Sequence, residues 1–256
     1  MPMLQIHQFP CLSDNYGFLV HDPASGATAT IDTPDADEIL RQAAVKGWRI
    51  TDVWNTHWHP DHAGGNAAIK AATGALVTGP AEVERIGAAP DRVVAENDVI
   101  KLGAAEARVL DVGGHTLGHI AYVFDSEDVA FVGDALFALG CGRLFEGTPQ
   151  QMWTSLQKIA ALPDEATLYC AHEYTQSNAR FAVTVDSGNA ALAARAAEID
   201  QLRAAGKPTV PMTLRIEKAT NPFLRAPALK PSLGLEGAAD WEAFAEVRRR
   251  KDAFKG

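Results

Sequence analysis

Cysteine is scarce in this chain of 256 residues. Its three cysteines, Cys11, Cys141 and Cys170, are an odd number at unrelated spacings, unlike the framework of a disulfide-stapled domain. Disulfides are rare in reducing compartments. The cysteine usage therefore favours a reducing setting, and we expect a cytoplasmic protein.

Long apolar runs and a surplus of basic residues are also missing. No window reaches eighteen uninterrupted apolar residues, and the opening MPMLQIH has neither a basic nor an apolar stretch, which disfavours a membrane span or a secretory leader. The formal net charge is −9, whereas nucleic-acid binding normally shows as a basic surplus. We therefore expect a soluble protein without a membrane or nucleic-acid partner.

The chain does have ample apolar material. Hydrophobic residues make up 47% and charged residues 21%, which is the composition of a globular protein. A chain of this length can form one large domain, or a core with a small appendage.

A histidine-rich stretch, THWHPDHAGGN at residues 56–66, places His57, His59, Asp61 and His62 within six residues. It directly follows a strand-like run. Alternate side chains of an extended chain share a face, so His57 and His59 point the same way, whereas Asp61 and His62 fall where a helix begins. Without a cation these groups would lose their solvation and repel one another. The spacing predicts two adjacent metal ions, and a site without thiolates that must also hold water is typical of catalysis.

Three more ligand-type residues follow short strand-like runs: His115, Asp134 and His172. Side chains at several strand ends can converge on one rim of a layered fold. Taken alone, each of the three could equally be a packing residue.

Two nearby polar residues have more than one interpretation. His119 could be a further ligand, but Leu117-Gly118 suggests a turn before it, and we favour a supporting or packing role. Asp32 ends a strand-like run and could either orient a ligating histidine or cap the helix that follows.

Five motifs, THWHPDH, GGHTLGH, VGDALF, GCGRLFEGT and AHEYT, together resemble the metallo-β-lactamase superfamily and, within it, the hydroxyacylglutathione hydrolases. The likeness runs from residues 12–16 to residues 249–252, with fewer motifs between 178 and 221. It implies an α+β fold, a four-layer αββα sandwich. The catalytic domain would span residues 1–173 and a small helical substrate-binding region residues 174–256. Periodicity alone shows only mixed α and β structure.

The resemblance also implies a site with two metal ions. Its ligands would be His57, His59 and His115 for the first ion and Asp61, His62 and His172 for the second, with Asp134 bridging the two. Asp61 and Asp134 would belong to the catalytic machinery, because they hold the ions that activate the attacking water. Zinc is the expected metal, although nitrogen and oxygen ligands also accept iron or manganese.

Four residues match the family's glutathione-binding positions: Arg143, Tyr174, Arg248 and Lys251. Arg248 and Lys251 lie three apart on one helical face, and we expect both at the exposed rim of the site. The alternative is the solvated end of a C-terminal helix, where cations are favoured by the dipole. Phe145 stands where some relatives have tyrosine, so a hydrogen bond from that hydroxyl is expected to be absent.

The implied function is hydrolysis of S-D-lactoylglutathione to D-lactate and glutathione, the second step of methylglyoxal detoxification, by a monomer. A persulfide dioxygenase of the same fold is the alternative, with one iron and the Asp61 and His62 site unfilled. A lactonase or β-lactamase is disfavoured by the C-terminal helix, and a non-enzymatic module with structural metals by the motif GCGRLFEGT.

Turn residues and periodicity predict the elements in between. We expect strands at 4–9, 16–20 and 27–31, a helix at 34–46 and one helix from 61 to about 73. We also expect a helix with Thr148 as its N-cap and Pro149 as its first residue, running to 161, a proline-rich loop at 207–231 and helices at 178–185, 189–205 and 240–254.

Overall fold

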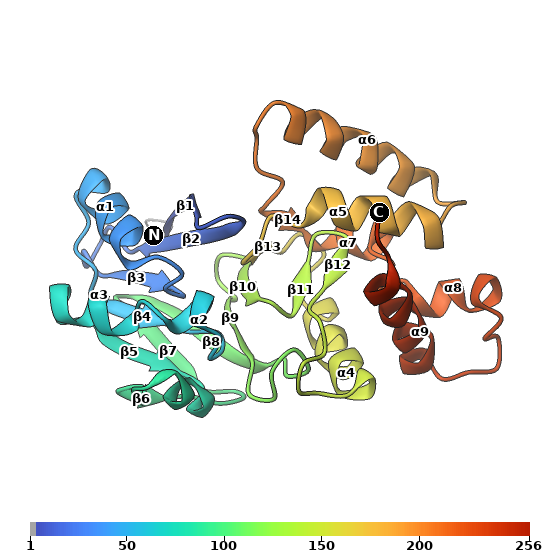
Figure 1. Ribbon diagram of the computed structural model, residues 1–256. Helices are drawn as coiled ribbons and strands as arrows, with labels where there is room; N and C mark the ends of the chain where they lie inside the picture. Colours follow the sequence, from blue (N-terminus) through green and yellow to red (C-terminus); the bar gives the residue numbers. More distant parts are fainter. Residues whose placement is uncertain (1–3) are drawn as a thin grey trace. The chain divides into compact units, whose positions relative to one another are not determined.

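The computed structural model of the protein describes residues 4–256 (Figure 1). Its strands are β1 (Gln5–Cys11), β2 (Asn15–His21), β3 (Thr28–Ile31), β4 (Asp52–Trp54), β5 (Leu76–Gly79), β6 (Arg92–Val93), β7 (Val99–Leu102), β8 (Ala105–Asp111), β9 (Ile120–Phe124), β10 (Val129–Gly133), β11 (Leu136–Phe137), β12 (Gly140–Cys141), β13 (Thr167–Cys170) and β14 (Met212–Thr213). Its helices are α1 (Ala36–Lys46), α2 (Pro60–Ala63), α3 (Asn66–Thr73), the 3-10 helix η1 (Ala81–Ile86), α4 (Pro149–Ala160), α5 (Thr175–Val185), α6 (Ala190–Ala204), α7 (Leu214–Thr220), α8 (Ala226–Leu233) and α9 (Asp240–Ala253).

The chain divides into two compact units. The first unit is the chain up to Asp111 together with Gly118–Gly133, and the second unit is Val112–Leu117 together with Asp134–Gly256.

The first unit holds two sheets. One sheet has the order β1-β2-β3-β4-β5-β6, antiparallel up to β3 and parallel from there on. In the other, β7, β8, β9 and β10 are antiparallel neighbours in sequence order. The sheets pack through aromatic side chains, with the ring centroids of Trp54 and Tyr122 5.3 Å apart and those of Phe18 and Phe131 5.5 Å apart.

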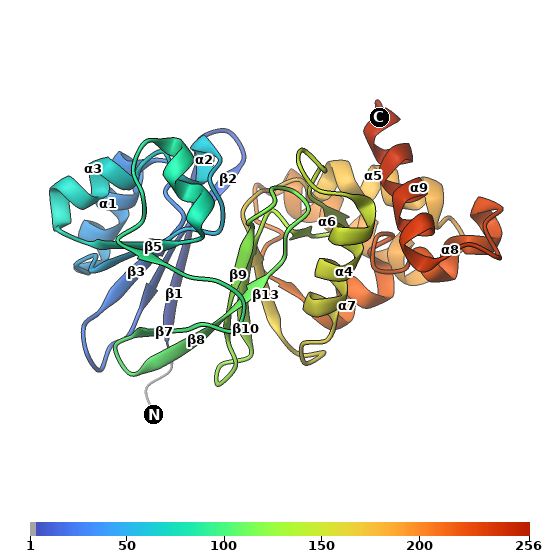
Figure 2. The same ribbon diagram turned by 90° about the horizontal axis from the view of Figure 1, so that it is seen from below.

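Helices α1 and α3 cover the outer face of the β1–β6 sheet, and β7 and β8 lie on its other side (Figure 2). Ile39 of α1 and Ile69 of α3 are fully buried with Leu19 and Val53 of the sheet. Burying each such side chain contributes about 1.5–3 kcal/mol. The first unit is therefore layered as helices, sheet and sheet.

The second unit is mainly helical. Its strands form two short antiparallel pairs, β11 with β12 and β13 with β14. Leu139, which lies between β11 and β12, packs with buried residues of α5 and α6. Phe244 of α9 contacts Trp153 of α4, with 6.1 Å between ring centroids.

Most expected elements form, with three corrections. Helix α1 begins at Ala36, two residues later than expected, because the Asp35 side chain caps it at the Glu38 N–H. The single helix expected from residue 61 is two helices, α2 and α3. The chain turns at Gly64-Gly65, where a Cβ on Gly65 would lie 2.7 Å from the Thr33 carbonyl oxygen.

The third correction concerns the proline-rich region 207–231, which is not a loop throughout. It contains α7 and most of α8. Pro227 lies in the first turn of α8, where its missing N–H costs nothing, and Pro231 lies near the end of the helix.

Among residues 4–256, no helix is long and apolar enough to cross a membrane.

Candidate metal centre

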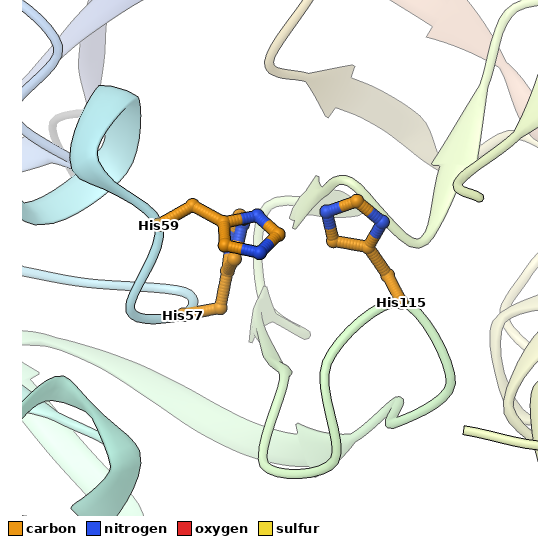
Figure 3. A group of neighbouring side chains, drawn as sticks. All are labelled: His57, His59 and His115. Carbon is orange, nitrogen blue, oxygen red and sulfur yellow. The ribbon is translucent and has the colours of Figure 1, made fainter. Parts of the chain in front are cut away.

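The histidine-rich stretch forms a compact group of ligand atoms in the first unit. It leaves β4 and enters α2, which begins at Pro60 with His59 as its N-cap residue. His57 Nε2 lies 3.0 Å from His59 Nδ1. Figure 3 shows His57 and His59 on the segment that enters a helix, and His115 on a separate loop. His62 Nε2 lies 3.5 Å from Asp61 Oδ2. The stretch therefore offers two pairs of ligand atoms.

Neighbouring residues fix the backbone and side chains of this stretch. Asn15 donates to Asp61 Oδ2 at 3.2 Å and to the Asp61 carbonyl at 3.4 Å. Asn55 donates to the His62 carbonyl at 2.9 Å. His119 stacks on the ring of His57, with centroids 4.6 Å apart, which fits the packing role favoured from the sequence.

A second group of ligand atoms lies in the second unit, around Asp134. One carboxylate oxygen, Oδ2, is 3.4 Å from His115 Nε2, and the other, Oδ1, is 3.3 Å from His172 Nε2. Each oxygen thus faces a different histidine. A carboxylate divided in this way has the geometry of a bridging ligand.

Neighbouring groups fix the rings of His115 and His172, the two histidines of the second unit. His115 Nδ1 donates to the Arg143 carbonyl at 2.8 Å. Because a carbonyl can only accept, this contact puts the proton on Nδ1 and the lone pair on Nε2. His172 stacks on Tyr174, with ring centroids 4.6 Å apart and an interplanar angle of 3°.

Close backbone approach around Asp134 requires glycine at position 142. A Cβ on Gly142 would lie 2.1 Å from the Asp134 carbonyl oxygen and 3.0 Å from His115 Nδ1. Any side chain at this position would displace a candidate ligand.

The donor set fits a divalent metal. Groups of His and Asp side chains among the described residues have ligand atoms within 4.8 Å of one another and could hold an ion. Burial raises the pKa of the Cys141 thiol to about 11 and that of Cys170 to about 12, so neither offers a thiolate near neutral pH. Imidazole and carboxylate ligands suit zinc, iron and manganese.

The four predicted substrate-binding residues all lie in the second unit, in different environments. Arg143 is exposed, and Tyr174 is 38% exposed. Lys251 Nζ donates to the Ser177 carbonyl at 3.2 Å and lies over the rings of Phe181 and Phe254. Burial, followed by the charges of Arg248 and Arg143, lowers the pKa of Lys251 to about 8.

The sequence predicts that Arg248 lies at the exposed rim of the site, and this prediction is wrong. Arg248 is only 5% exposed. Its guanidinium donates to the Cys141 carbonyl at 3.0 Å and twice to Asp252, at 3.0 and 2.7 Å. Arg248 therefore ties α9 to β12.

A buried polar cluster that the sequence does not predict holds the hairpin of β11 and β12, which follows Asp134. Glu217, fully buried, accepts from Leu139 N at 2.9 Å and from Asn221 at 3.0 Å, and pairs with Arg195. Asn221 also donates to the carbonyls of Phe137 and Gly140. No local signal marks these residues, because Glu217 is a charged residue within a helix and its partners are far away along the chain.

The chain is similar to known proteins along its length. A family profile described as "Metallo-beta-lactamase superfamily" matches residues 17–172, and one described as "Hydroxyacylglutathione hydrolase C-terminus" matches residues 173–254. A protein of Maricaulis maris named "Hydroxyacylglutathione hydrolase" is 57% identical over 99% of this chain and 100% of its own length. The chain belongs to the hydroxyacylglutathione hydrolase family. A protein of the same name from Erythrobacter litoralis is 60% identical over 98% of this chain and 100% of its own length.

The chain is also similar in fold to solved structures. A crystal structure of ETHE1 from Myxococcus xanthus has a TM-score of 0.66 and 24% identity to this hydroxyacylglutathione hydrolase family member, covering 98% of this chain and 100% of the other. The expected α+β fold, the four-layer αββα sandwich of the superfamily, is confirmed.

Proposed function

We propose that this chain hydrolyses the thioester of an S-2-hydroxyacylglutathione, S-D-lactoylglutathione being the expected substrate, to D-lactate and glutathione. Membership of the hydroxyacylglutathione hydrolase family supports the reaction. The single structural observation that carries the proposal is Asp134, whose two oxygens face His115 and His172 separately. A bridging carboxylate is the part of a two-metal site that one-metal chemistry does not need.

We assign the ligands of two divalent cations, most simply zinc, as the family resemblance implies. His57, His59 and His115, the residues drawn in Figure 3, would hold the first. Asp61, His62 and His172 would hold the second, and Asp134 would bridge. When bound, such cations act as Lewis acids and can lower the pKa of a water from about 15.7 to about 7.

The protein's own residues would orient the substrate. Lys251 and Arg143 supply positive charge for the glycine carboxylate of glutathione, and Arg248 ties α9 to β12, just before Arg143, by its bond to the Cys141 carbonyl. Tyr174 presents a half-exposed ring beside His172. Glutathione leaves as a thiolate, and a thiol of pKa about 8.5 needs no protein acid to do so.

Partners and setting follow the same proposal. The three cysteines are buried free thiols, which suits a cytoplasmic protein, and the net charge of −9 suits a small-molecule enzyme without nucleic-acid or membrane partners. We propose a monomer in which residues 1–173 form the catalytic domain and residues 174–256 the substrate-binding region.

The test is to offer the purified protein S-D-lactoylglutathione and, separately, glutathione persulfide. We expect release of D-lactate and free thiol from the first and no oxygen uptake with the second. Oxygen consumption with the persulfide and no thioester cleavage would instead identify a dioxygenase of this fold.

A further inference from the structure

Asp32 has a backbone conformation that residues other than glycine rarely adopt, with φ at 58°. It follows β3, which pairs in parallel with β4 so that Ile31 is opposite Trp54, and its N–H donates to the Trp54 carbonyl at 2.9 Å. This register places Asp32 beside the chain that leaves β4 towards the histidines. The helix-capping alternative does not apply, because Asp35 caps α1.

Within residues 4–256, the hydrogen bonds of the Asp32 side chain come from the histidine-rich stretch. Oδ1 accepts from Thr56 N at 2.7 Å. Oδ2 accepts from the Thr56 hydroxyl at 2.9 Å and from His62 Nδ1 at 2.8 Å. Asp32 is 4% exposed, and His62 only 1%. A buried carboxylate needs such partners, and here they come from one loop.

The positions of the protons follow from these contacts. Thr56 has one hydroxyl hydrogen, and a carboxylate can only accept, so that hydrogen points to Asp32. Thr56 Oγ1 also lies 3.1 Å from His57 Nδ1, so there the oxygen must accept and His57 Nδ1 must carry a proton. His62 Nδ1 faces the carboxylate and must carry one as well.

Both rings are thereby left with their lone pair on Nε2. These are the two atoms that face the other candidate ligands: His57 Nε2 lies 3.0 Å from His59 Nδ1, and His62 Nε2 lies 3.5 Å from Asp61 Oδ2. A hydrogen-bond partner on the far nitrogen fixes which nitrogen binds a metal and raises its basicity.

We propose that Asp32 is a positioning residue shared by both metal sites. It orients His62 of the second site directly and His57 of the first site through the Thr56 hydroxyl. The inference rests on the proposed function, from which it takes the assignment of His57 and His62 to different cations. It also explains a strained, buried aspartate that belongs to none of the candidate ligand groups of the described residues.

The experiment begins with the protonation of the rings. Histidine nitrogens of the ¹⁵N-labelled, chelator-treated protein are observed by long-range ¹H–¹⁵N correlation NMR. We expect the Nδ1–H form for His57 and His62. Thr56→Val, which removes only the hydroxyl, should change His57 and leave His62, and Thr56→Ser should restore the wild-type form. Asp32→Asn should change both, because its amide can donate to His62 Nδ1 and to Thr56 Oγ1, which frees the Thr56 hydroxyl hydrogen for His57 Nδ1.

Metal affinity is then measured by competition with a chromophoric chelator. Asp32→Asn should weaken zinc binding at both sites, by roughly 10- to 100-fold, and Thr56→Val chiefly at one. Asn keeps the shape of Asp32 and tolerates a positive φ. The matched control is Asp52→Asn, because Asp52 begins β4, the strand paired with β3, and accepts from Thr51 at 2.7 Å. Its side-chain hydrogen bonds within residues 4–256 involve no candidate ligand.

The inference would be overturned by an Nε2–H form of His57 or His62 in the wild type, or by wild-type affinity for two zinc ions in Asp32→Asn. Loss of affinity in Asp52→Asn equal to that in Asp32→Asn would also overturn it, since the effect would then be general. The measurements need no substrate. A failure to hydrolyse lactoylglutathione would therefore contradict the proposed function while leaving this result intact.

Discussion

If Lys251 binds the glycine carboxylate as proposed, the binding of glutathione compounds should depend on pH. The ammonium of Lys251 lies among Phe181, Phe254 and the Ser177 carbonyl, and burial with the charges of Arg248 and Arg143 lowers its pKa from 10.5 to about 8. Lys251 is therefore charged at pH 7 and loses its proton as the pH rises through about 8. If only the charged form binds the glycine carboxylate, the dissociation constant should rise about 10-fold between pH 7 and pH 9.

The assay is calorimetric titration with S-methylglutathione, which has neither a thiol nor a thioester. In Lys251→Arg the rise should vanish, because a guanidinium stays charged over this range. In Lys251→Met binding at pH 7 should weaken about 10-fold, near the lower end for a charged hydrogen bond. Lys101→Met, which removes an exposed lysine of β7, is the matched control and should leave binding unchanged.

A second ligand tests whether Lys251 binds the glycine carboxylate of glutathione. S-methylglutathione amidated at its glycine end keeps the amine of the parent compound, and its binding should not follow the titration of Lys251. An unchanged dissociation constant from pH 7 to pH 9 in the wild type would refute the reasoning, and so would an equal rise in Lys251→Arg.

The lowered pKa of Lys251 also makes the free energy of unfolding depend on pH. Between pH 8 and pH 10.5 the unfolded chain holds more protons on this group than the folded protein, so the contribution of Lys251 to stability rises with pH across that window. Lys251→Met should therefore melt at a higher temperature than the wild type at pH 7, with a smaller difference at pH 10.

Three further predictions concern the metal centre and its support. Asp134→Ala should remove most metal from both sites and nearly all activity, because each of its oxygens faces a candidate ligand; metal analysis beside kcat checks this, and two retained ions with near-normal turnover would contradict the bridging role. His62→Ala should empty chiefly the second site and lower kcat at least about 10²-fold, whereas preferential loss of the first ion would contradict the division of ligands. Glu217→Ala should lower the free energy of unfolding by about 3–5 kcal/mol, because the partly buried Arg195 loses its carboxylate and the buried Leu139 N–H and Asn221 amide lose an acceptor. Urea denaturation measures that loss beside Glu165→Ala, which removes an exposed ion pair with Arg215 and should cost less than about 1 kcal/mol; equal losses would contradict the argument.

The candidate ligands of the histidine-rich stretch were predictable because their chemistry is local, whereas His115, Asp134 and His172 were assigned only through the family motifs. His57, His59, Asp61 and His62 share one loop, and alternation along an extended chain pairs the first two, as the structure does. The fold followed from the motifs rather than from periodicity, which shows only that helices and strands are mixed.

The supporting contacts were not predictable, because they join residues far apart in the chain. Arg248 donates to the carbonyl of Cys141, 107 residues away, and is buried where the helix pattern suggested an exposed end. Glu217 accepts from Leu139 N, 78 residues away. The break between α2 and α3 depends on the Thr33 carbonyl, which packs against Gly65. None of these partners is encoded in a local pattern.

The central claim, a thioester hydrolase with two metal ions, is tested most directly by titrating the metal-free protein with zinc while S-D-lactoylglutathione hydrolysis is followed. The account predicts no turnover without metal, a rise in kcat that levels off at two equivalents of zinc, and equal amounts of D-lactate and glutathione. Full turnover by the metal-free protein, or none by the protein that has bound two equivalents, would contradict it.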